Sequence, residues 1–322
     1  MPRSSSPPLP SEIETVFRRI KNLGNDRVLR GSNNAGIYLV RRRDTGKKYI
    51  EKTFTANQIR LREHRSEITL LKSCKHKNIT KFIAAWRVDE ASAHLIAEYC
   101  RHGTLYDLHL KYKDAGLFIP ESFARKAMED LVSGLAYLHW GLKEWTPDRG
   151  NVTNRQRGWR SIAHRDLNMC NIFLQRGKGM YPRLVIGDFG SACGDDDRNW
   201  DHGPRAIAHA VIPPEYPRMK HSADVWAVGC AMQILCRQDD GPFLPIPGNL
   251  NTRVWVRHPM AYEIRGAGQK YSKGLRECVD MCLTFKYAQR LASDHILGHI
   301  MDIANYSNVE KVPLLENVYP TR

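Results

Sequence analysis

The sequence lacks a hydrophobic run long enough to cross a lipid bilayer. Its longest apolar stretch, Val225–Leu235, is much shorter than the roughly 20 residues that a membrane-spanning helix needs. The first ten residues also lack an apolar core, so we expect a flexible tail over residues 1–11 and no secretory leader. The sequence therefore predicts no membrane partner.

Cysteines are scattered along the chain. None of the eight forms a C-x-x-C pair, and only Cys278 and Cys282 lie at a helical i,i+4 spacing. This distribution favours neither a disulfide framework nor a zinc site. We therefore expect a reducing compartment, cytoplasmic or nuclear.

Acidic residues are scarce relative to basic ones. The chain has 34 Asp and Glu against 49 Lys and Arg, a formal net charge of +15, and most of this excess lies in the first 100 residues. Such an excess suits binding of nucleic acid, an acidic membrane surface or an acidic substrate, and it is equally typical of a solvated surface. A hydrophobic content of 42% excludes a chain that is disordered throughout.

The hydrophobic pattern changes along the chain from strand-like to helical. Near the start we expect short strands over residues 27–54, a helix over 57–74, and strands over 82–88 and 94–99. From Pro120 the pattern is helical; residues 224–235 are apolar nearly all round, and 275–302 form a further helical region. This order predicts an α+β protein with a small sheet domain, a short hinge and a larger helical domain.

A glycine-rich turn lies between two predicted strands. It runs from Gly31 through Asn33 to Gly36, and Lys52 follows sixteen residues later on the next strand. Backbone N–H groups of such a turn can approach phosphate oxygens, and a lysine beyond it can neutralise their charge. The turn alone is equally explained as a hairpin connection.

Two polar motifs follow in the second half of the chain. The first runs from His164 through Arg165 and Asp166 to Asn171, and the second is Asp188-Phe189-Gly190. One carboxylate can accept a hydroxyl proton, while an asparagine and a second carboxylate hold Mg²⁺ against phosphates. These residue types in this order predict phosphoryl transfer.

With these motifs the sequence resembles the eukaryotic protein kinase family over about residues 27–300. Trp159, shortly before the first motif, is similar to a feature of some fungal kinase-like proteins. The resemblance implies a two-lobed α+β fold with an N-lobe over 12–99, a hinge at 100–103, a C-lobe over 104–305 and a tail over 306–322. Residues 141–160 form an insertion before the catalytic loop.

The resemblance also assigns roles to residues, with ATP and Mg²⁺ as cofactors and a protein Ser/Thr hydroxyl as acceptor. Asp166 orients the hydroxyl, Asn171 and Asp188 hold Mg²⁺, and Lys52 pairs with Glu67, or otherwise with Glu63 one turn earlier. Gly31, Asn33 and Gly36 cover the phosphates. The residues expected around adenine are Tyr38, Ile50, Ala97, Glu98, Cys100 and Phe173.

The chain departs from the family pattern at positions that bear on catalysis. Asn168 stands where most serine/threonine kinases have a lysine, and Tyr38 and Ile50 are larger than the usual adenine contacts. The missing cation implies a slow enzyme. A pseudokinase that serves as a nucleotide-binding or scaffold module is the alternative. A small-molecule phosphotransferase is disfavoured by the family landmarks Pro213-Pro214-Glu215, Asp224-Val225-Trp226 and Arg290.

Two further segments leave alternatives open. The activation segment, 188–215, has Ser191 as its only hydroxyl residue, and Asp195–Asp197 either pair with Arg165 or form a solvated acidic loop. The basic insertion 141–160 is a surface loop or a site for a partner or RNA. We expect an acidic protein partner at the basic N-lobe or at this insertion, and no nucleic acid.

Overall fold

The structure is a computed structural model that describes residues 15–23, 36–90, 92–145, 154–200, 211–237, 265–266, 269–306, 309–316 and 319. The chain divides into two compact units, one of Met1–Lys75 with Ile79–Cys100 and one of His76–Asn78 with Arg101–Arg322. The first is built on a sheet and the second mainly on helices, so the α+β class is confirmed.

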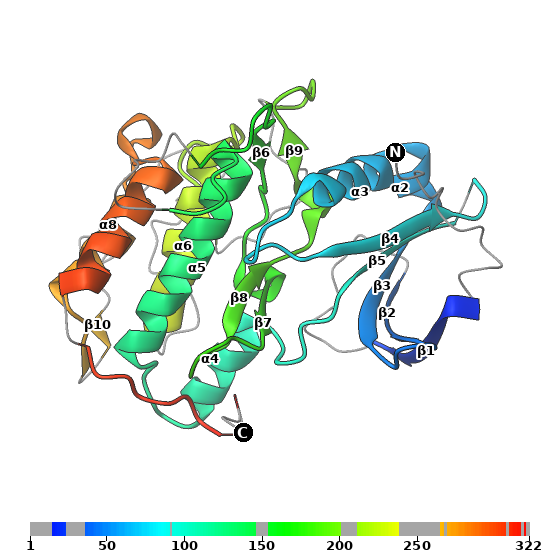
Figure 1. The fold of residues 1–322 in the computed structure, drawn as a ribbon. Coiled ribbons are helices and arrows are strands. Elements are labelled where there is room, and N and C mark those ends of the chain that lie inside the picture. Colours follow the sequence, from blue (N-terminus) through cyan, green and yellow to red (C-terminus); the bar gives the residue numbers. More distant parts are fainter. Residues whose placement is uncertain are drawn as a thin grey trace. The chain divides into compact units, whose positions relative to one another are not determined.

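The first unit is a five-stranded antiparallel sheet in the order β1-β2-β3-β5-β4 (Figure 1). The strands are β1 (Phe17–Asn22), β2 (Gly36–Arg42), β3 (Lys48–Phe54), β4 (Phe82–Arg87) and β5 (Ala93–Glu98). One face buries Val40, Tyr49 and Ile96, with Phe17 and Trp86 packed against them. β1 precedes the region 27–54 in which strands were expected, and residues 27–35 of that region lie outside the described residues.

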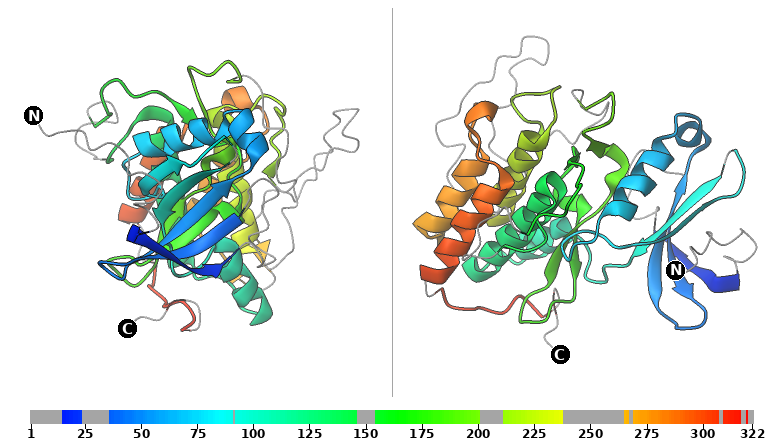
Figure 2. Two further views of the ribbon diagram at one scale, coloured as in Figure 1. Left: turned by 90° about the vertical axis from the view of Figure 1, so that its right-hand side faces the viewer. Right: turned by 45° about the horizontal axis from the view of Figure 1, so that its top comes forward.

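Two helices take the place of the single helix expected over 57–74. They are α2 (Ala56–Arg60) and α3 (Glu63–Ser73), and α3 lies beside the sheet in Figures 1 and 2. Thr55 and Gln58 form a capping box that starts α2. The break falls at Arg62, whose φ of 61° is left-handed and incompatible with a continuous helix.

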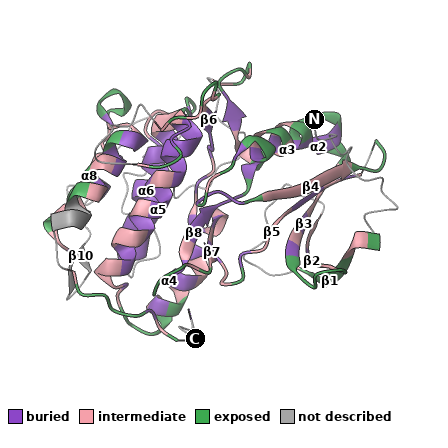
Figure 3. Cartoon of the chain, viewed as in Figure 1, coloured by how far each residue is buried: buried purple, intermediate pink, exposed green. Residues whose placement is uncertain are grey.

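The helices of the second unit pack around a buried central helix. They are α4 (Leu105–Asp114), α5 (Glu121–Trp140), α6 (His221–Cys236), α7 (Lys273–Cys282) and α8 (Ser293–Tyr306). α6 packs against α5 and α7, and both α5 and α6 are largely buried (Figure 3). The helical region expected over 275–302 is two helices, α7 and α8, joined through the 3₁₀ turn η4 (Tyr287–Gln289).

Short strands and 3₁₀ turns carry the polar motifs of the second unit. β6 (Ile162–Ala163) pairs with β9 (Cys193–Gly194), and β7 (Ile172–Gln175) pairs with β8 (Arg183–Ile186). The 3₁₀ turns are η1 (Met169–Asn171) and η2 (Phe189–Ser191). A small hairpin of β10 (Arg265–Gly266) and β11 (Gln269–Lys270) precedes α7.

Residues 154–160 of the insertion pack onto the second unit. The indole of Trp159 donates to the Leu138 carbonyl at 2.9 Å and its ring lies 4.7 Å from that of Tyr137. α5 ends at Gly141, where φ is 69° and a Cβ would lie 2.6 Å from Trp159. Arg155 pairs with Asp294 at 2.8 Å. Trp159 and Arg155 therefore attach the insertion to α5 and α8, which favours the surface-loop interpretation.

Among the described residues, no helix combines the length and apolarity needed to cross a membrane. The eight cysteines all carry free thiols, and all except Cys170 are buried.

Candidate active site

In the first unit, the lysine of β3 forms a buried ion pair with α3. Lys52 Nζ lies 2.8 Å from Glu67 Oε1 and 3.1 Å from Oε2. The Glu67 side chain is 4% exposed, whereas Glu63 one turn earlier faces solvent. The alternative partner Glu63 is therefore excluded, and the pair holds the ammonium group at a fixed place on the sheet.

The strand register decides which side chains share a face with Lys52. Residues directly opposite each other in an antiparallel pair point to the same side of the sheet. Ile37 lies opposite Lys52, Leu39 lies opposite Ile50, and Ala97 lies opposite Ile50 on the other neighbouring strand. Ile50 and Ala97 are thus on the lysine face, as expected for residues that contact a nucleotide base.

Tyr38 is a correction to the sequence analysis. It lies opposite Glu51, on the other face of the sheet from Lys52, because it is one residue out of step with Ile37. The Arg19 guanidinium covers its ring at 3.9 Å. Tyr38 therefore does not belong to the adenine-contacting set, and Ile37, which the sequence analysis missed, takes its place on the lysine face.

A polar cluster fixes that opposite face. Arg19 donates to both carboxylate oxygens of Glu51 at 2.7 Å, and the His94 ring contacts Glu51 Oε1 at 2.8 Å. Burial by itself raises the pKa of the Glu51 carboxyl, but the hydrogen bonds from Arg19 and His94 lower it to about 2. The carboxylate thus stays charged and ties β1, β3 and β5 together.

The structure describes some of the remaining residues that were predicted to contact the nucleotide. Glu98 ends β5, and its backbone N–H donates to the Lys81 carbonyl at 3.0 Å, while Cys100 is buried. Gly36 begins β2, but Gly31 and Asn33 lie outside the described residues. Phe173, in the second unit, is half-buried on β7 opposite Val185. Their roles stay predictions.

In the second unit, the first polar motif is held by a buried aspartate of α6. Asp224 accepts from the backbone N–H groups of His164 and Arg165, both at 2.7 Å. His139 also contacts Asp224, at 3.1 Å from Nε2 to Oδ2. Arg165 has a left-handed φ of 67°, so these two hydrogen bonds fix a backbone conformation that the residue would otherwise rarely adopt. The predicted structural role of Asp224 is confirmed.

Two side-chain amides hold the carboxylate of Asp166. Asn168 Nδ2 donates to Oδ1 at 3.0 Å, and Asn171 Nδ2 donates to Oδ2 at 3.1 Å. Asn168 also accepts from the backbone N–H of Cys170 at 2.9 Å and so caps η1. The residue that replaces the usual lysine therefore orients the Asp166 carboxylate, a contact that the sequence analysis did not anticipate.

The pKa of Asp166 is raised above its ordinary value. Burial is the main cause, and the nearby charge of Asp188 acts in the same direction. Hydrogen bonds from Asn168 and Asn171 oppose the shift. A carboxylate with a raised pKa is a stronger base than an exposed one, which suits a group that accepts a hydroxyl proton.

The β7–β8 hairpin brings Asn171 and Asp188 together. Ile172 pairs with Ile186 at one end of the hairpin, so the residues just outside these strands are neighbours. The Gly187 N–H donates to the Asn171 carbonyl at 2.9 Å. Asp188 is exposed and has a φ of 57°, and its carboxylate caps η2 through the Gly190 N–H at 3.3 Å.

The donor set of these two residues fits a hard divalent cation. Asn171 directs its Nδ2 toward Asp166, so its Oδ1 acceptor is directed elsewhere, and the Asp188 carboxylate is exposed. Amide and carboxylate oxygens are the ligands that Mg²⁺ prefers. Phe189 is buried with its ring 5.2 Å from that of His164, which anchors the turn behind Asp188.

Arg165 does not pair with the acidic run Asp195–Asp197, and that hypothesis is wrong. Its guanidinium instead donates to the carbonyls of Asn199, Trp200 and Met219 at 2.7–3.0 Å. Asp195 accepts from the Ser161 N–H, and Asp196 pairs with Arg160. The β6–β9 pairing places the acidic run beside Ser161. Asp195 and Asp196 therefore have Ser161 and Arg160 as partners in place of Arg165.

The expected ion pair across the second unit is present. Arg290 Nη1 lies 2.6 Å from Glu215 Oε1, and Nη2 lies 3.1 Å from Oε2. Both side chains are almost fully buried, and the Arg290 guanidinium lies 4.9 Å from the Trp226 ring. This pair anchors the end of the activation segment to α6 and η4.

The first unit is a β-sheet with a Lys–Glu pair. The second is helical and holds a fixed Asp–Asn loop beside an Asp-Phe-Gly turn. Together these features define the kinase class of proteins. The sequence profile of the protein kinase domain matches residues 28–301. The chain belongs to the protein kinase family.

Curated relatives agree with this assignment. The chain is 24% identical over 266 residues to the serine/threonine-protein kinase Nek2 of Homo sapiens, which covers 80% of this chain and 54% of Nek2. It is 27% identical over 237 residues to the serine/threonine-protein kinase plk-2 of Caenorhabditis elegans, 70% of this chain and 32% of plk-2. For the G2-specific protein kinase fin1 of Schizosaccharomyces pombe the identity is 28% over 207 residues, 62% of this chain and 28% of fin1. The aligned part is thus at most about half of these relatives.

Proposed function

We propose that this chain transfers the γ-phosphoryl group of ATP to Ser or Thr hydroxyls of proteins. The fixed carboxylate of Asp166 is the observation that carries the proposal, because each of its oxygens accepts a different amide N–H. A carboxylate held in this way accepts the hydroxyl proton of the acceptor without first having to reorient. The relatives named serine/threonine-protein kinases support this choice of acceptor, as does the lack of a tryptophan in the six residues directly before Pro213.

The other residues of the site bind and orient the nucleotide. Lys52, held by Glu67, donates to phosphate oxygens, and Ile37, Ile50 and Ala97 offer an apolar face to adenine. Asn171 and Asp188 are the residues that would hold Mg²⁺. When bound, this ion neutralises negative charge on the phosphates.

A nucleotide-binding pseudokinase is the second candidate. It is favoured by one observation: Asn168 supplies hydrogen bonds to Asp166 and Cys170 but no positive charge for the transferring phosphoryl group. Such a loop positions its aspartate and yet stabilises the transition state less than a lysine would. A cytoplasmic or nuclear location remains a prediction, supported by the eight free thiols.

Phosphate transfer from radiolabelled ATP to generic protein substrates tests the proposal. Wild type, Asp166→Asn and Asp188→Asn are compared with Mg²⁺ or Mn²⁺, and Asp114→Asn, an exposed residue at the end of α4, is the matched control. We expect both site variants to lose about 100-fold or more of the rate, Asp166→Asn because it removes the general base and Asp188→Asn because it removes a carboxylate that would hold Mg²⁺. The control should keep the wild-type rate.

The two candidates give different outcomes in this assay. If wild type is no faster than Asp166→Asn, and yet ATP with Mg²⁺ raises its melting temperature, the chain is a nucleotide-binding pseudokinase. If ATP also leaves the melting temperature unchanged, nucleotide binding itself is excluded.

A further inference from the structure

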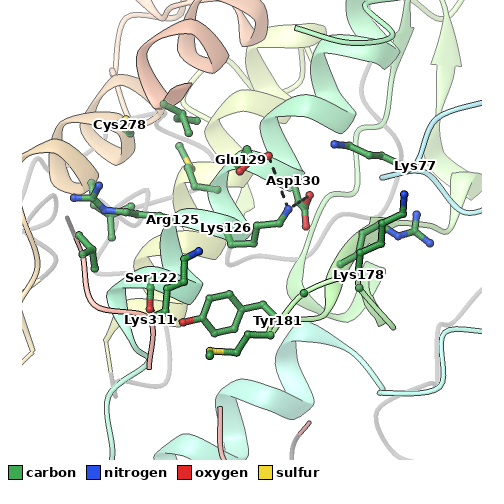
Figure 4. Close-up of a pocket in the computed structure, with 18 of the residues that line it drawn as sticks. Lys77, Ser122, Arg125, Lys126, Glu129, Asp130, Lys178, Tyr181, Cys278 and Lys311 are labelled. Atoms are coloured by element: carbon green, nitrogen blue, oxygen red, sulfur yellow. Dashed lines mark hydrogen bonds and ion pairs between the residues drawn. The ribbon is translucent and has the colours of Figure 1, made fainter. Parts of the chain in front are cut away.

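A groove of about 1020 Å³ lies within the second unit and shares no lining residue with the candidate active site. Its walls are the first half of α5, the turn that joins β7 to β8, α7, α8 and the segment around Val309 and Lys311 (Figure 4). This volume exceeds that of most small-molecule pockets, which are about 300–1,000 Å³. The groove is therefore large enough for a segment of polypeptide.

Hydrogen bonds make the C-terminal wall part of the fold. The Tyr181 hydroxyl donates to the Val312 carbonyl at 2.8 Å and lies 2.6 Å from Ser122 Oγ. The Val312 N–H contacts the same Ser122 oxygen at 3.4 Å. The segment that carries Lys311 is thus bound to α5 and to the β7–β8 turn, and the groove exists before any ligand arrives.

The rim of the groove carries an excess of positive charge. Seven of its lining residues are Lys or Arg, whereas only Glu129 and Asp130 are acidic. Both acidic residues lie within 4 Å of Lys126, at 3.9 and 2.5 Å. The ammonium group of Lys126 therefore offsets one of these two negative charges inside the groove.

Four of the cations are exposed: Lys77, Arg176, Lys178 and Lys311. None of the four forms an ion pair with any residue in the described part of the chain. They come from three separate segments, and Figure 4 shows Lys77 and Lys178 across the groove from Lys311. Cations spread in this way match an extended anion better than a single phosphate group.

The floor of the groove is apolar. Met128, Leu275, Cys278 and Ile300 are buried there, and Met180 is an exposed hydrophobic residue of the β7–β8 turn. A nucleic-acid backbone would gain nothing from this floor, because its phosphates are satisfied by charge alone. A peptide that alternates acidic and apolar side chains satisfies both the rim and the floor.

We propose that this groove is a docking site for an acidic peptide segment of a partner protein, with at least one apolar side chain seated on the floor. The site would recruit a substrate or a regulator that carries such a segment. This docking does not depend on phosphoryl transfer, because no groove residue belongs to the candidate active site.

Fluorescence anisotropy with a labelled 12-residue peptide of alternating Glu and Leu tests the proposal at about 150 mM salt, where distant charges are screened. Wild type should bind it saturably. Lys178→Glu with Lys311→Glu should weaken binding about tenfold, since two rim contacts become repulsive. Lys48→Glu with Lys286→Glu, which makes the same charge change at two other exposed lysines, should weaken it less than about threefold.

The controls distinguish the occupant and separate docking from activity. Asp166→Asn should bind the peptide as wild type does, even where it abolishes phosphate transfer. A peptide with Gln in place of Glu should not bind. The proposal is overturned if no saturable binding is seen, if both lysine pairs weaken it equally, or if a labelled DNA duplex binds more tightly and loses affinity in Lys178→Glu with Lys311→Glu.

Discussion

At the residue scale, Asn168 does more than remove a lysine from the catalytic loop. Its amide holds one oxygen of Asp166, and its carbonyl caps η1. Because a hydrogen bond to the ionised carboxyl lowers its pKa, the loss of Asn168 should raise the pKa of Asp166 further. Asn168 is therefore a positioning residue with an effect that can be measured.

We expect Asn168→Ala to lower kcat by about tenfold, as for the loss of one oriented hydrogen bond, and to move the acidic limb of the kcat–pH profile to higher pH. Asn168→Ser is the matched control, since serine keeps the helix cap but not the amide donor. Asn168→Lys should raise turnover above that of wild type, because lysine keeps a hydrogen-bond donor at this position and adds a positive charge. A fall in kcat with an unmoved pH profile would show that Asn168 acts only through the cap.

The same scale shows where the sequence was sufficient and where it was not. Lys52, Glu67 and the Asp166 loop could be predicted because their residue types and spacing are dictated by the chemistry they serve. Tyr38 could not be placed by counting forward from Gly36, since a slip of one residue moves a side chain to the other face of the sheet. Counting back from the turn at Asp44–Gly46 gives the observed register, with Ile37 opposite Lys52.

At the element scale, the activation segment is anchored without a phosphate group. Trp200 gives its carbonyl to Arg165 at 2.7 Å, and its ring packs edge-on against His221 at 5.2 Å. His221 stacks on His139 at 4.3 Å, and His139 contacts Asp224. One continuous set of contacts thus links this segment to the aspartate that fixes the catalytic loop.

This anchor predicts activity that does not require phosphorylation of the segment. Treatment with a protein phosphatase should change kcat by less than about twofold, whereas Trp200→Ala should lower kcat/KM for a protein substrate about tenfold by loosening the segment. Trp200→Phe keeps an aromatic ring against His221 and should retain most of the activity. The prediction is contradicted if phosphatase treatment abolishes activity and Ser191→Ala has the same effect. Activity would then be regulated by phosphorylation of Ser191.

Some helices and strands could be predicted from the sequence, and others could not. α6 was evident because its residues are apolar all round, and α5 because Pro120 and an apolar stripe mark it. The break between α2 and α3 was not, since Arg62 has no sequence feature that demands a left-handed backbone. β1 was also missed, because five of its six residues are exposed and show no alternating pattern.

At the scale of the whole molecule, the net charge of +15 no longer points to the first unit alone. In the insertion, Arg155 and Arg160 are already paired with Asp294 and Asp196. The groove of the second unit instead combines cations that form no ion pair within the described residues with an apolar floor. Charge density by itself does not single out a binding site, because binding needs shape as well as charge.

The pKa values of buried groups predict how the whole chain responds to acid. Burial lowers the pKa of His221 to about 3 and that of His76 to about 4, and the pKa of Glu51 is about 2. For each of these groups the unfolded chain takes up a proton at a higher pH than the folded chain does. Acidification therefore favours unfolding, from about pH 6.5 downward through the histidines and from about pH 4.5 downward through Glu51.

We accordingly expect the melting temperature, followed by circular dichroism, to be nearly constant from pH 8 to pH 7 and to fall progressively below about pH 6.5. Glu51→Gln should be less stable than wild type at pH 7, because Arg19 and His94 lose their charged partner, but it should lose less stability between pH 4.5 and pH 3.5. Glu63→Gln, at an exposed position of α3, is the matched control and should follow wild type throughout. If Glu51→Gln falls as steeply as wild type over that interval, Glu51 is not the group whose protonation destabilises the sheet.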